Sequence, residues 1–261
     1  MSNNISPLAY IEEGAQIGEN VKIGPFCCVY NDTVIGDGTI LENNVTIFPG
    51  ARIGKNVHIF PGACIATVPQ DLKFKGEYTT VEIGDGTQLH ECVTVHRGTA
   101  SKMVTKIGKN CMIMAYCHVA HDCVLGNHVI MSNTVQLAGE VEVGDYAVLG
   151  GGALVHQFTH IGCHVMIQGG SLVNKDIPPY VMAGRYPISY EGVNSIGLHR
   201  RGFSEEQINR IQAVYRILYL SQLSRKDAIA KILEDVAESA ERDEIVKFVN
   251  SSPRGIIRMG I

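Results

Sequence analysis

Aliphatic residues recur at every sixth position along most of the chain. One series runs from Ile5 to Ile65, a short one from Ile83 to Val95, and a third from Ile107 to Val173. Ala, Val, Cys, Thr or Ser stands four positions after the aliphatic residue in nearly every unit. A period of six matches neither the 3.6-residue period of a helix nor the two-residue alternation of a long strand.

This period predicts a mainly β fold, a parallel β-helix built from hexapeptide units, each contributing one short strand and one corner. The large aliphatic side chains would fill the interior of a triangular prism, and the small residues would fit its corners. Three units make one coil, so residues 18 apart lie on the same face. Strands of successive coils would then stack at about 4.8 Å.

Two segments break the period and predict loops that project from the prism. Residues 66–80 contain a proline, several charges and two aromatic residues, and residues 100–106 interrupt the next unit. A solenoid tolerates insertions at its corners, and such loops often carry the binding face. Either loop could equally be a tolerated insertion without a function.

The repeat ends after Val173, and turns follow to about residue 203. Ser204 and Gln207 then form the pattern of a capping box at the start of a helix. Ser224 is placed to cap a second helix, and we expect a third near residues 241–250. These helices predict a small C-terminal helical domain.

We therefore divide the chain into two expected domains. Residues 1–190 would form the β-helix domain, with its loops at 66–80 and 100–106. Residues 191–261 would form the helical domain.

The register of the coils gathers polar residues from distant units onto one face. If the loop at 100–106 projects outward, the units that begin at Val95, Val119, Leu137 and Val155 stack on four successive coils. The candidate residues of these units and their corner are His96, His118, His121, Asp122, Gly139, His156 and Gln157. Imidazole can transfer protons near neutral pH, and the carboxylate of Asp122 could orient that of His121.

Three chemistries fit such a column: a zinc site, acyl transfer by a general base, or no catalysis in a rod-like binding protein. A zinc site would need a defined set of three histidines, which the column lacks. Asp122, Gln157 and Arg97 suit recognition of a sugar or a phosphate better. We therefore favour acyl transfer, with no metal and no cofactor.

Composition and charge narrow the partners. A formal net charge of −4 argues against general binding to nucleic acid, and no apolar run approaches the roughly 20 residues of a membrane span. The first seven residues lack the features of a secretory signal, so we expect a cytoplasmic protein without stable membrane insertion. The eight cysteines contain no CxxC pair, which favours reduced, buried thiols.

Seven sequence motifs, which follow one another in order, resemble those of a known family. The resemblance is therefore specific, and it covers essentially the whole chain. They are VPQDLKFKGE at residues 68–77, HRGT at 96–99, HVAHDC at 118–123, VHQF at 155–158, DIPPYV at 176–181, GVN at 192–194 and GLHRRGF at 197–203. The chain resembles the acyl-ACP:UDP-N-acetylglucosamine O-acyltransferase family, whose reaction begins lipid A synthesis. The resemblance implies a left-handed coil.

The resemblance also implies a mechanism. His121 would be the general base that takes the proton from the 3-hydroxyl of UDP-N-acetylglucosamine. That hydroxyl would attack the thioester of a 3-hydroxyacyl chain on acyl carrier protein, without a covalent enzyme intermediate. Asp122 would support the imidazole, and the backbone N–H of Gly139 would stabilise the oxyanion.

Further roles follow from the same resemblance. Asn194, Arg200 and Arg201 would hold the uridine diphosphate, and Gly169 matches the position that gauges acyl length. The residues expected to bind the glucosamine, the phosphopantetheine or the acyl chain are Asp71, Lys73, His96, His118, His156 and Gln157. The family is a homotrimer with a site at each interface between subunits.

Glu140 departs from the family, whose members carry His there, and residues 182–188 do not match the family's nucleotide-contacting turn. Related alternatives remain open: a UDP-sugar with a 3-amino group, or the N-acylation of a glucosamine in the same pathway. A zinc-dependent hexapeptide hydratase is a more distant alternative. The basic residues that could steer acyl carrier protein are Arg200, Arg201, Arg210, Arg216, Lys226, Arg254 and Arg258.

Overall fold

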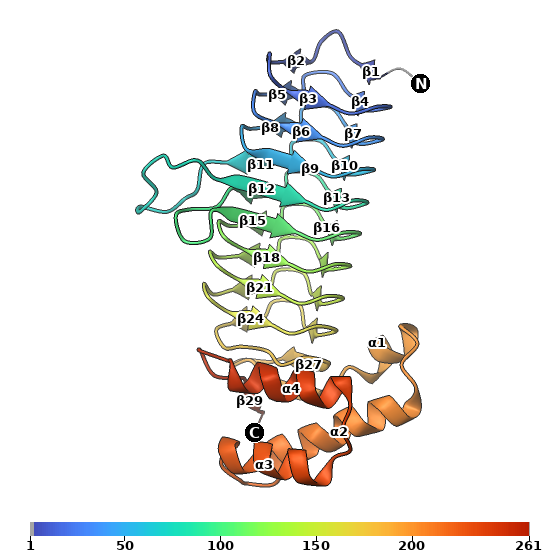
Figure 1. Ribbon diagram of the computed structural model, residues 1–261, viewed down its shortest axis with the longest axis vertical. Helices are drawn as coiled ribbons and strands as arrows, with labels where there is room; N and C mark the ends of the chain where they lie inside the picture. The colour runs from blue at the N-terminus through green and yellow to red at the C-terminus, as the bar shows by residue number, and fades with distance from the viewer. Residues whose placement is uncertain (1–2, 261) are drawn as a thin grey trace.

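A three-sided β-helix followed by four helices makes up the computed structural model, which describes residues 3–260 (Figure 1). Residues 1, 2 and 261, the outer ends of the two expected domains, lie outside the described part. Each coil contributes one strand to each of three parallel sheets, here called A, B and C. The prediction of a parallel β-helix with a helical C-terminal region is confirmed.

Sheet A also receives three strands from beyond the repeats. Its strands are β1 (Asn4–Ile5), β4 (Lys22–Ile23), β7 (Ile40–Leu41), β10 (His58–Ile59), β13 (Gln88–Leu89), β16 (Met112–Ile113), β19 (Ile130–Met131), β22 (Val148–Leu149), β25 (Met166–Ile167), β27 (Val181–Gly184), β28 (Ser189–Val193) and β29 (Arg258–Met259). β28 pairs antiparallel with β27, and β29 pairs parallel with β28.

Sheets B and C contain only strands of the coils. The strands of sheet B are β2 (Tyr10–Ile11), β5 (Cys28–Val29), β8 (Thr46–Ile47), β11 (Cys64–Thr67), β14 (Thr94–His96), β17 (His118–Val119), β20 (Gln136–Leu137), β23 (Leu154–Val155) and β26 (Leu172–Val173). The strands of sheet C are β3 (Gln16–Ile17), β6 (Val34–Ile35), β9 (Ala51–Ile53), β12 (Thr80–Ile83), β15 (Val104–Ile107), β18 (Val124–Leu125), β21 (Glu142–Val143) and β24 (His160–Ile161).

The interior of the prism is filled as the repeat predicts. The aliphatic residue of each unit points inward, so Ile35, Leu41 and Ile47 of one coil are almost completely buried. The small residue that follows four positions later is also buried, as at Cys111 and Cys117. Burial of this kind stabilises a solenoid by roughly 1.5–3 kcal/mol for each large aliphatic side chain.

Both expected loops are present, and both project on the same side of the prism (Figure 1). Their bounds differ from the prediction, because the flanking residues continue the strands: Thr67 pairs with His96, and Thr80 pairs with Val104. The loops therefore span residues 68–79 and 97–103. Both leave the corner between sheets B and C, here called the BC corner.

The helical region contains α1 (Ser195–Arg200), α2 (Glu205–Leu220), α3 (Arg225–Asp235) and α4 (Ala240–Asn250). The predicted capping box of Ser204 and Gln207 starts α2, and Ser224 caps α3 as predicted. The prediction that turns connect the repeats to the helices was wrong in detail, since the connecting stretch holds β27, β28 and α1. A six-residue helix and a hairpin leave too short a pattern to be read from sequence. The expected division after residue 190 falls inside β28.

None of the helices in residues 3–260 has the length and apolar character needed to cross a membrane.

Candidate active site

His121 and Asp122 occupy the BC corner directly after β17. Asp122 adopts a left-handed backbone conformation, with φ of 60°, and its side chain is completely buried. Its Oδ2 lies 2.8 Å from Nδ1 of His121. Because an ionised carboxylate only accepts hydrogen bonds, this contact places the proton on Nδ1 and leaves the lone pair of Nε2 free. The pair therefore presents a basic nitrogen away from the corner.

A hollow of about 440 Å³ lies beside this nitrogen on the outer face of sheet B. His96, His118, His121, Gly139 and Gln157 line it, and they come from four successive coils. Parallel pairing of β14, β17, β20 and β23 produces this convergence, because Val95, Val119, Leu137 and Val155 stand in one register. The column expected from the sequence is thus assembled around one hollow.

Gly139 lies directly against the imidazole of His121. A Cβ atom at this position would stand 2.5 Å from both Cε1 and Nε2 of His121, so only glycine leaves the ring its place. Within residues 3–260, the backbone N–H of Gly139 donates to no acceptor. An unpaired donor beside a basic nitrogen is the arrangement that an oxyanion requires.

His96 and His118 face each other edge to face, with ring centroids 4.6 Å apart. Burial lowers the pKa of His96 to about 4, helped by the neighbouring His118 and His121, and burial likewise lowers the pKa of His118. Both rings are therefore neutral at pH 7 and can bind a substrate without competing for its proton. His118 was expected at a corner, but it lies in β17, where Nδ1 is 2.7 Å from Oγ1 of Thr94.

The first loop brings its own carboxylate close to His121. Oδ2 of Asp71 lies 3.9 Å from Nε2 of His121. Lys73 contributes its backbone N–H to Oδ1 of Asp71, at 2.9 Å, while its side chain is exposed. Gln70, which the sequence did not single out, lines the hollow and donates its N–H to Nδ1 of His96. Only the position of Gln70 next to Asp71 could have suggested it.

The residues expected to hold the nucleotide lie elsewhere in the chain. Asn194 caps α1 through Gly197 and donates to the carbonyl of His164, and the Arg201 guanidinium lies 5.4 Å above the ring of Tyr146. His164 and Tyr146 belong to the corner between sheets C and A, here called the CA corner. Figure 1 shows α1 and the two loops on opposite sides of the prism. One chain therefore does not bring these residues to His121.

Four further expected residues differ in where they lie relative to the hollow. Gln157 lines it, whereas His156 is exposed and contacts the carbonyl of Gln157 through Nδ1 at 3.0 Å. Gly169 is exposed in the turn from sheet A to sheet B, where a Cβ atom would come 3.0 Å from the Gly151 carbonyl. Arg200, at the end of α1, is exposed.

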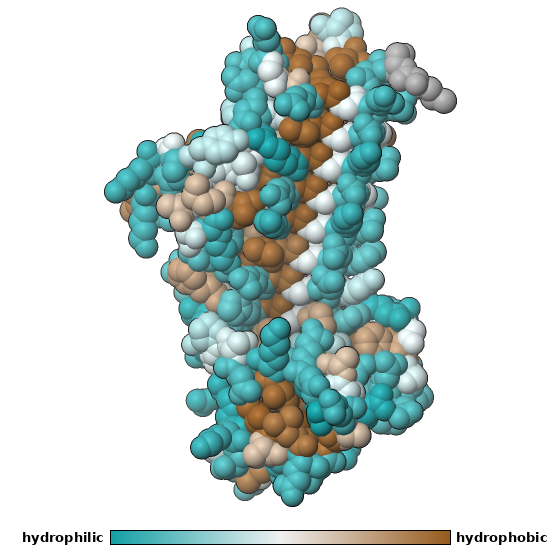
Figure 2. All heavy atoms as spheres, in the orientation of Figure 1, coloured by the Kyte–Doolittle hydropathy of each residue, from teal (hydrophilic) through white to brown (hydrophobic). Residues whose placement is uncertain are grey.

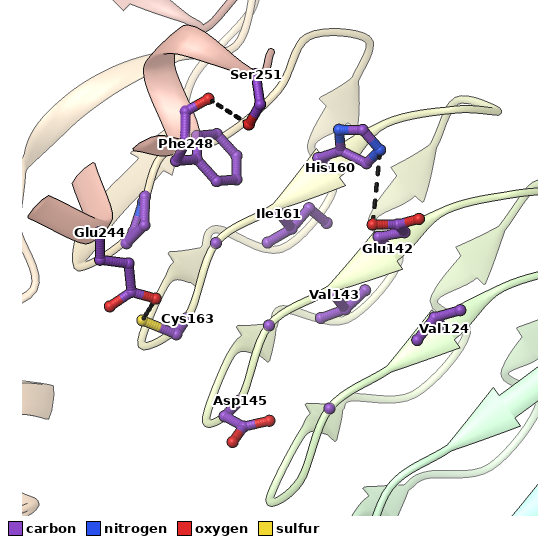
Figure 3. A pocket seen from close by; sticks show the side chains of 14 residues that line it. Val124, Glu142, Val143, Asp145, His160, Ile161, Cys163, Glu244, Phe248 and Ser251 are labelled. Atoms are coloured by element: carbon purple, nitrogen blue, oxygen red, sulfur yellow. Dashed lines mark hydrogen bonds and ion pairs between the residues drawn. The ribbon is translucent and has the colours of Figure 1, made fainter. Parts of the chain in front are cut away.

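A larger hollow, of about 670 Å³, separates sheet C from α4 (Figure 3). There His160 is 3.7 Å from Glu142, and Sγ of Cys163 is 3.1 Å from Glu244. Burial, strengthened by Glu244, raises the pKa of the Cys163 thiol, so the sulfur is protonated and unreactive. This hollow lies where α4 meets the prism, and its thiol is not an activated nucleophile.

The exposed face of sheet C carries an apolar strip beside a row of glycines (Figure 2).

Within residues 3–260, no group of three or more His, Cys, Asp or Glu side chains is arranged to hold a metal ion.

Comparisons with known proteins agree along the whole chain. Residues 176–257 match the family model described as UDP N-acetylglucosamine O-acyltransferase, domain 2, and residues 14–49 and 105–135 match the bacterial transferase hexapeptide model. An acyl-[acyl-carrier-protein]–UDP-N-acetylglucosamine O-acyltransferase of Thiobacillus denitrificans is 42% identical over 97% of this chain and 99% of its own. The relative of the same name from Burkholderia lata is also 42% identical, with the same coverage.

Solved structures show the same likeness in three dimensions. A UDP-N-acetylglucosamine acyltransferase from Bacteroides fragilis is 50% identical, has a TM-score of 0.96, and is matched over 97% of this chain and 99% of that one. The enzyme from Arabidopsis is 30% identical, with a TM-score of 0.77 over 98% and 99% of the two chains. The expected fold class, a left-handed parallel β-helix with C-terminal helices, is confirmed.

Proposed function

Since the chain belongs to the acyl-[acyl-carrier-protein]–UDP-N-acetylglucosamine O-acyltransferase family, we propose that it transfers a 3-hydroxyacyl chain to UDP-N-acetylglucosamine. The donor is 3-hydroxyacyl-[acyl carrier protein], the acceptor is the 3-hydroxyl of the sugar, and the reaction is the first step of lipid A biosynthesis. The observation that carries the mechanism is the His121–Asp122 pair, whose free nitrogen faces the hollow.

His121 acts as the general base. Nε2 takes the proton of the sugar 3-hydroxyl while the oxygen attacks the thioester carbonyl, and Asp122 stabilises the imidazolium that forms. The imidazolium then returns the proton to the thiolate of the phosphopantetheine as the carbon–sulfur bond breaks. Protons balance within this cycle, so the mechanism needs neither a covalent enzyme intermediate nor a cofactor.

The N–H of Gly139 stabilises the tetrahedral oxyanion. The next coil places this donor against the ring of His121, so base and donor approach the same carbonyl carbon from neighbouring positions. A fixed backbone donor needs no reorganisation during the reaction, and removing one such donor costs about 10²–10³ in kcat in other acyl-transfer enzymes.

The side chains that hold the substrates are either neutral imidazoles or polar groups whose orientation is already fixed in the folded chain. Asp71 accepts a hydrogen bond from a sugar hydroxyl, and its distance of 3.9 Å from His121 supports this placement. His96, His118 and Gln157 line the hollow as hydrogen-bonding partners of the glucosamine or the phosphopantetheine. Lys73 and His156 bind the glucosamine, the phosphopantetheine or the acyl chain, and Gly169 leaves room for a long acyl chain.

A homotrimer completes each site. Asn194, Arg200 and Arg201 lie at the CA corner, so the uridine diphosphate reaches them only if a second chain brings its CA corner to the BC corner of the first. The guanidinium groups then pair with the diphosphate. A cytoplasmic location, where acyl carrier protein and UDP-sugars are supplied, fits this reaction.

The test replaces the base. His121→Ala should lower kcat by at least about a thousandfold, because proton removal from the hydroxyl loses its acceptor. The assay measures, by mass spectrometry, the product formed from UDP-N-acetylglucosamine and a series of 3-hydroxyacyl carrier proteins. The same series, run with a 3-amino UDP-sugar, separates O-acylation from N-acylation.

His160→Ala is the matched control, because His160 also faces a hollow and lies beside a carboxylate. Its activity should stay within about twofold of the parent. Substantial turnover by a folded His121→Ala variant would remove His121 from the role of base.

A further inference from the structure

We propose that the loop of residues 97–103 orients the catalytic pair and that Thr99 is a positioning residue, acting on His121 through the Asp122 carboxylate. This inference rests on the proposed role of His121 as general base. It gives a function to an insertion that the solenoid does not need for its fold.

The carboxylate of Asp122 is surrounded by donors of this loop. Oδ2 accepts from the hydroxyl of Thr99, at 2.6 Å, and from Nδ1 of His121, at 2.8 Å. Oδ1 accepts from the backbone N–H of Thr99, at 2.9 Å, and from that of Lys102, at 3.1 Å. Three of the four donors therefore come from residues 97–103.

The backbone of Asp122 is fixed from the same side. Its N–H donates to Oγ1 of Thr105, at 2.8 Å, and Thr105 lies in β15 directly after the loop. Both Asp122 and Thr105 are completely buried. Loop and strand together define the position and the rotation of this carboxylate.

Burial makes these donors necessary. A carboxylate without water stays charged only where hydrogen bonds replace its hydration. The hydroxyl of Thr99 is the only side-chain donor of the loop on Asp122, and it shares Oδ2 with the catalytic imidazole. Thr99 thus sets the direction from which Oδ2 meets Nδ1, and so the direction in which Nε2 points.

The hydroxyl itself has no freedom to turn. Its oxygen accepts from the N–H of Ser101, at 3.2 Å, while its proton must go to Asp122, because a carboxylate can only accept. The carbonyl of Thr99 accepts from Met103, at 2.8 Å, which closes the loop. Gly98 is the second residue of the loop, and a Cβ atom there would collide with the backbone N of Val104.

The loop also connects the pair to the first loop. The N–H of Ala100 donates to Oε1 of Glu77, at 2.9 Å, and Glu77 belongs to the loop that carries Asp71. A substrate contact at Asp71 and the orientation of His121 are therefore set by two loops that hold each other.

Thr99→Val tests the inference, since it keeps the shape of the side chain and both backbone donors but removes the hydroxyl. We expect kcat to fall by at least about tenfold, because a misdirected base loses general-base catalysis. The KM values for both substrates should stay within about twofold. Thr99→Ser, which restores the donor, should recover kcat to within about threefold of the parent.

Thr159→Val is the matched control. Thr159 is also a buried threonine of the BC corner, and within residues 3–260 its hydroxyl has no hydrogen-bond partner. The same substitution there should leave kcat within about twofold. Thermal denaturation of all variants reports whether the fold persists.

The outcomes separate the two proposals. If His121→Ala is inactive while folded Thr99→Val keeps the kcat of the parent, Thr99 does not position the base, but His121 keeps its role. If Thr99→Val does not fold, Thr99→Ala takes its place and should show the same loss of kcat at unchanged KM. Loss of kcat that Ser does not restore, or a loss confined to KM, also overturns the inference.

Discussion

His121 can accept a proton through only one nitrogen, and three neighbours decide which one and where it points. Asp122 holds Nδ1, the missing side chain of Gly139 leaves room for the ring, and Asp71 faces Nε2. His96 and His118 complete the surroundings as neutral rings. Such a base depends on the orientation of its ring, because a single orientation both keeps the hydrogen bond to Asp122 and directs Nε2 towards the hollow.

The buried imidazole of His96 predicts a loss of stability in mild acid. Its pKa lies at about 4 in the folded chain, against 6.5 without burial, so between these values the unfolded chain binds the extra proton. The contribution of His96 to the free energy of unfolding should therefore be fully present above pH 6.5. It should fall by up to about 3 kcal/mol as the pH drops towards 4.

Urea denaturation at pH 7.0 and pH 4.5, compared between the parent and His96→Gln, measures this contribution. The variant should lose less stability than the parent over that interval. Equal losses in both proteins would show that protonation of His96 does not oppose folding.

Residues whose position follows from the 18-residue repeat of the coils could be placed from the sequence. Residues outside that repeat could not. His96, His121 and Gly139 follow from counting units, because each coil repeats the same register. Asp71 and the hydroxyl of Thr99 lie in loops, whose conformation depends on local hydrogen bonds that no period encodes. Asn194 was expected at the nucleotide, and within one chain it caps α1.

At the scale of elements, two-residue strands are held together by backbone pairing and by close contact at the corners. Where sheet C turns into the CA corner, glycines of successive coils lie against each other, as Gly84, Gly108 and Gly126 do. α2 and α3 were predictable for a different reason, because Ser204 and Ser224 cap their first residues with their side chains. α1 also has a side-chain cap, Asn194, but its six residues are too few for a periodic pattern that the sequence could reveal.

Gly108→Ala tests the close contact between coils. Its Cβ atom would collide with the backbone carbonyl of Gly126, which cannot rotate away, so the two coils must separate. We expect a loss of about 1–3 kcal/mol in the free energy of unfolding, the usual cost of overpacking.

Gly151→Ala is the control, since the nearest neighbour of its new Cβ atom, the Asn133 carbonyl, is 3.3 Å away and has to shift by only a few tenths of an ångström. It should change stability by less than about 1 kcal/mol. Equal effects of both substitutions in urea denaturation would show that glycine at position 108 is not required by the packing of the coils.

At the scale of the whole molecule, the residues of the proposed site lie on two sides of one prism. His121, the proposed base, lies at the BC corner, and the residues expected at the nucleotide lie at the CA corner. Parallel prisms around a threefold axis would bring these corners together three times. The repeat pattern offers no such division, because a count of units does not distinguish contacts within a chain from contacts between chains. Only the family resemblance implied a site at each interface between subunits.

Mixing two inactive variants tests the shared site. His121→Ala and Arg201→Ala should each be nearly inactive, but trimers reassembled from both contain sites with an intact His121 and an intact Arg201 from different chains. We expect about a quarter of the parent activity after denaturation and refolding of an equal mixture, because random pairing makes one site in four intact. No recovery, with trimers verified by sedimentation, would place the whole site within one chain.

The prism has two unlike ends, which limits its growth. The helices cover the end where β26 and β27 lie, while β1, β2 and β3 each pair on one side only among the described residues, and Leu8 and Tyr10 are exposed beside them. Open strand edges can recruit another chain. A fibre, however, needs a second complementary end on each molecule. Since the helices occupy that end, two prisms could meet edge to edge once, and the assembly would stop there.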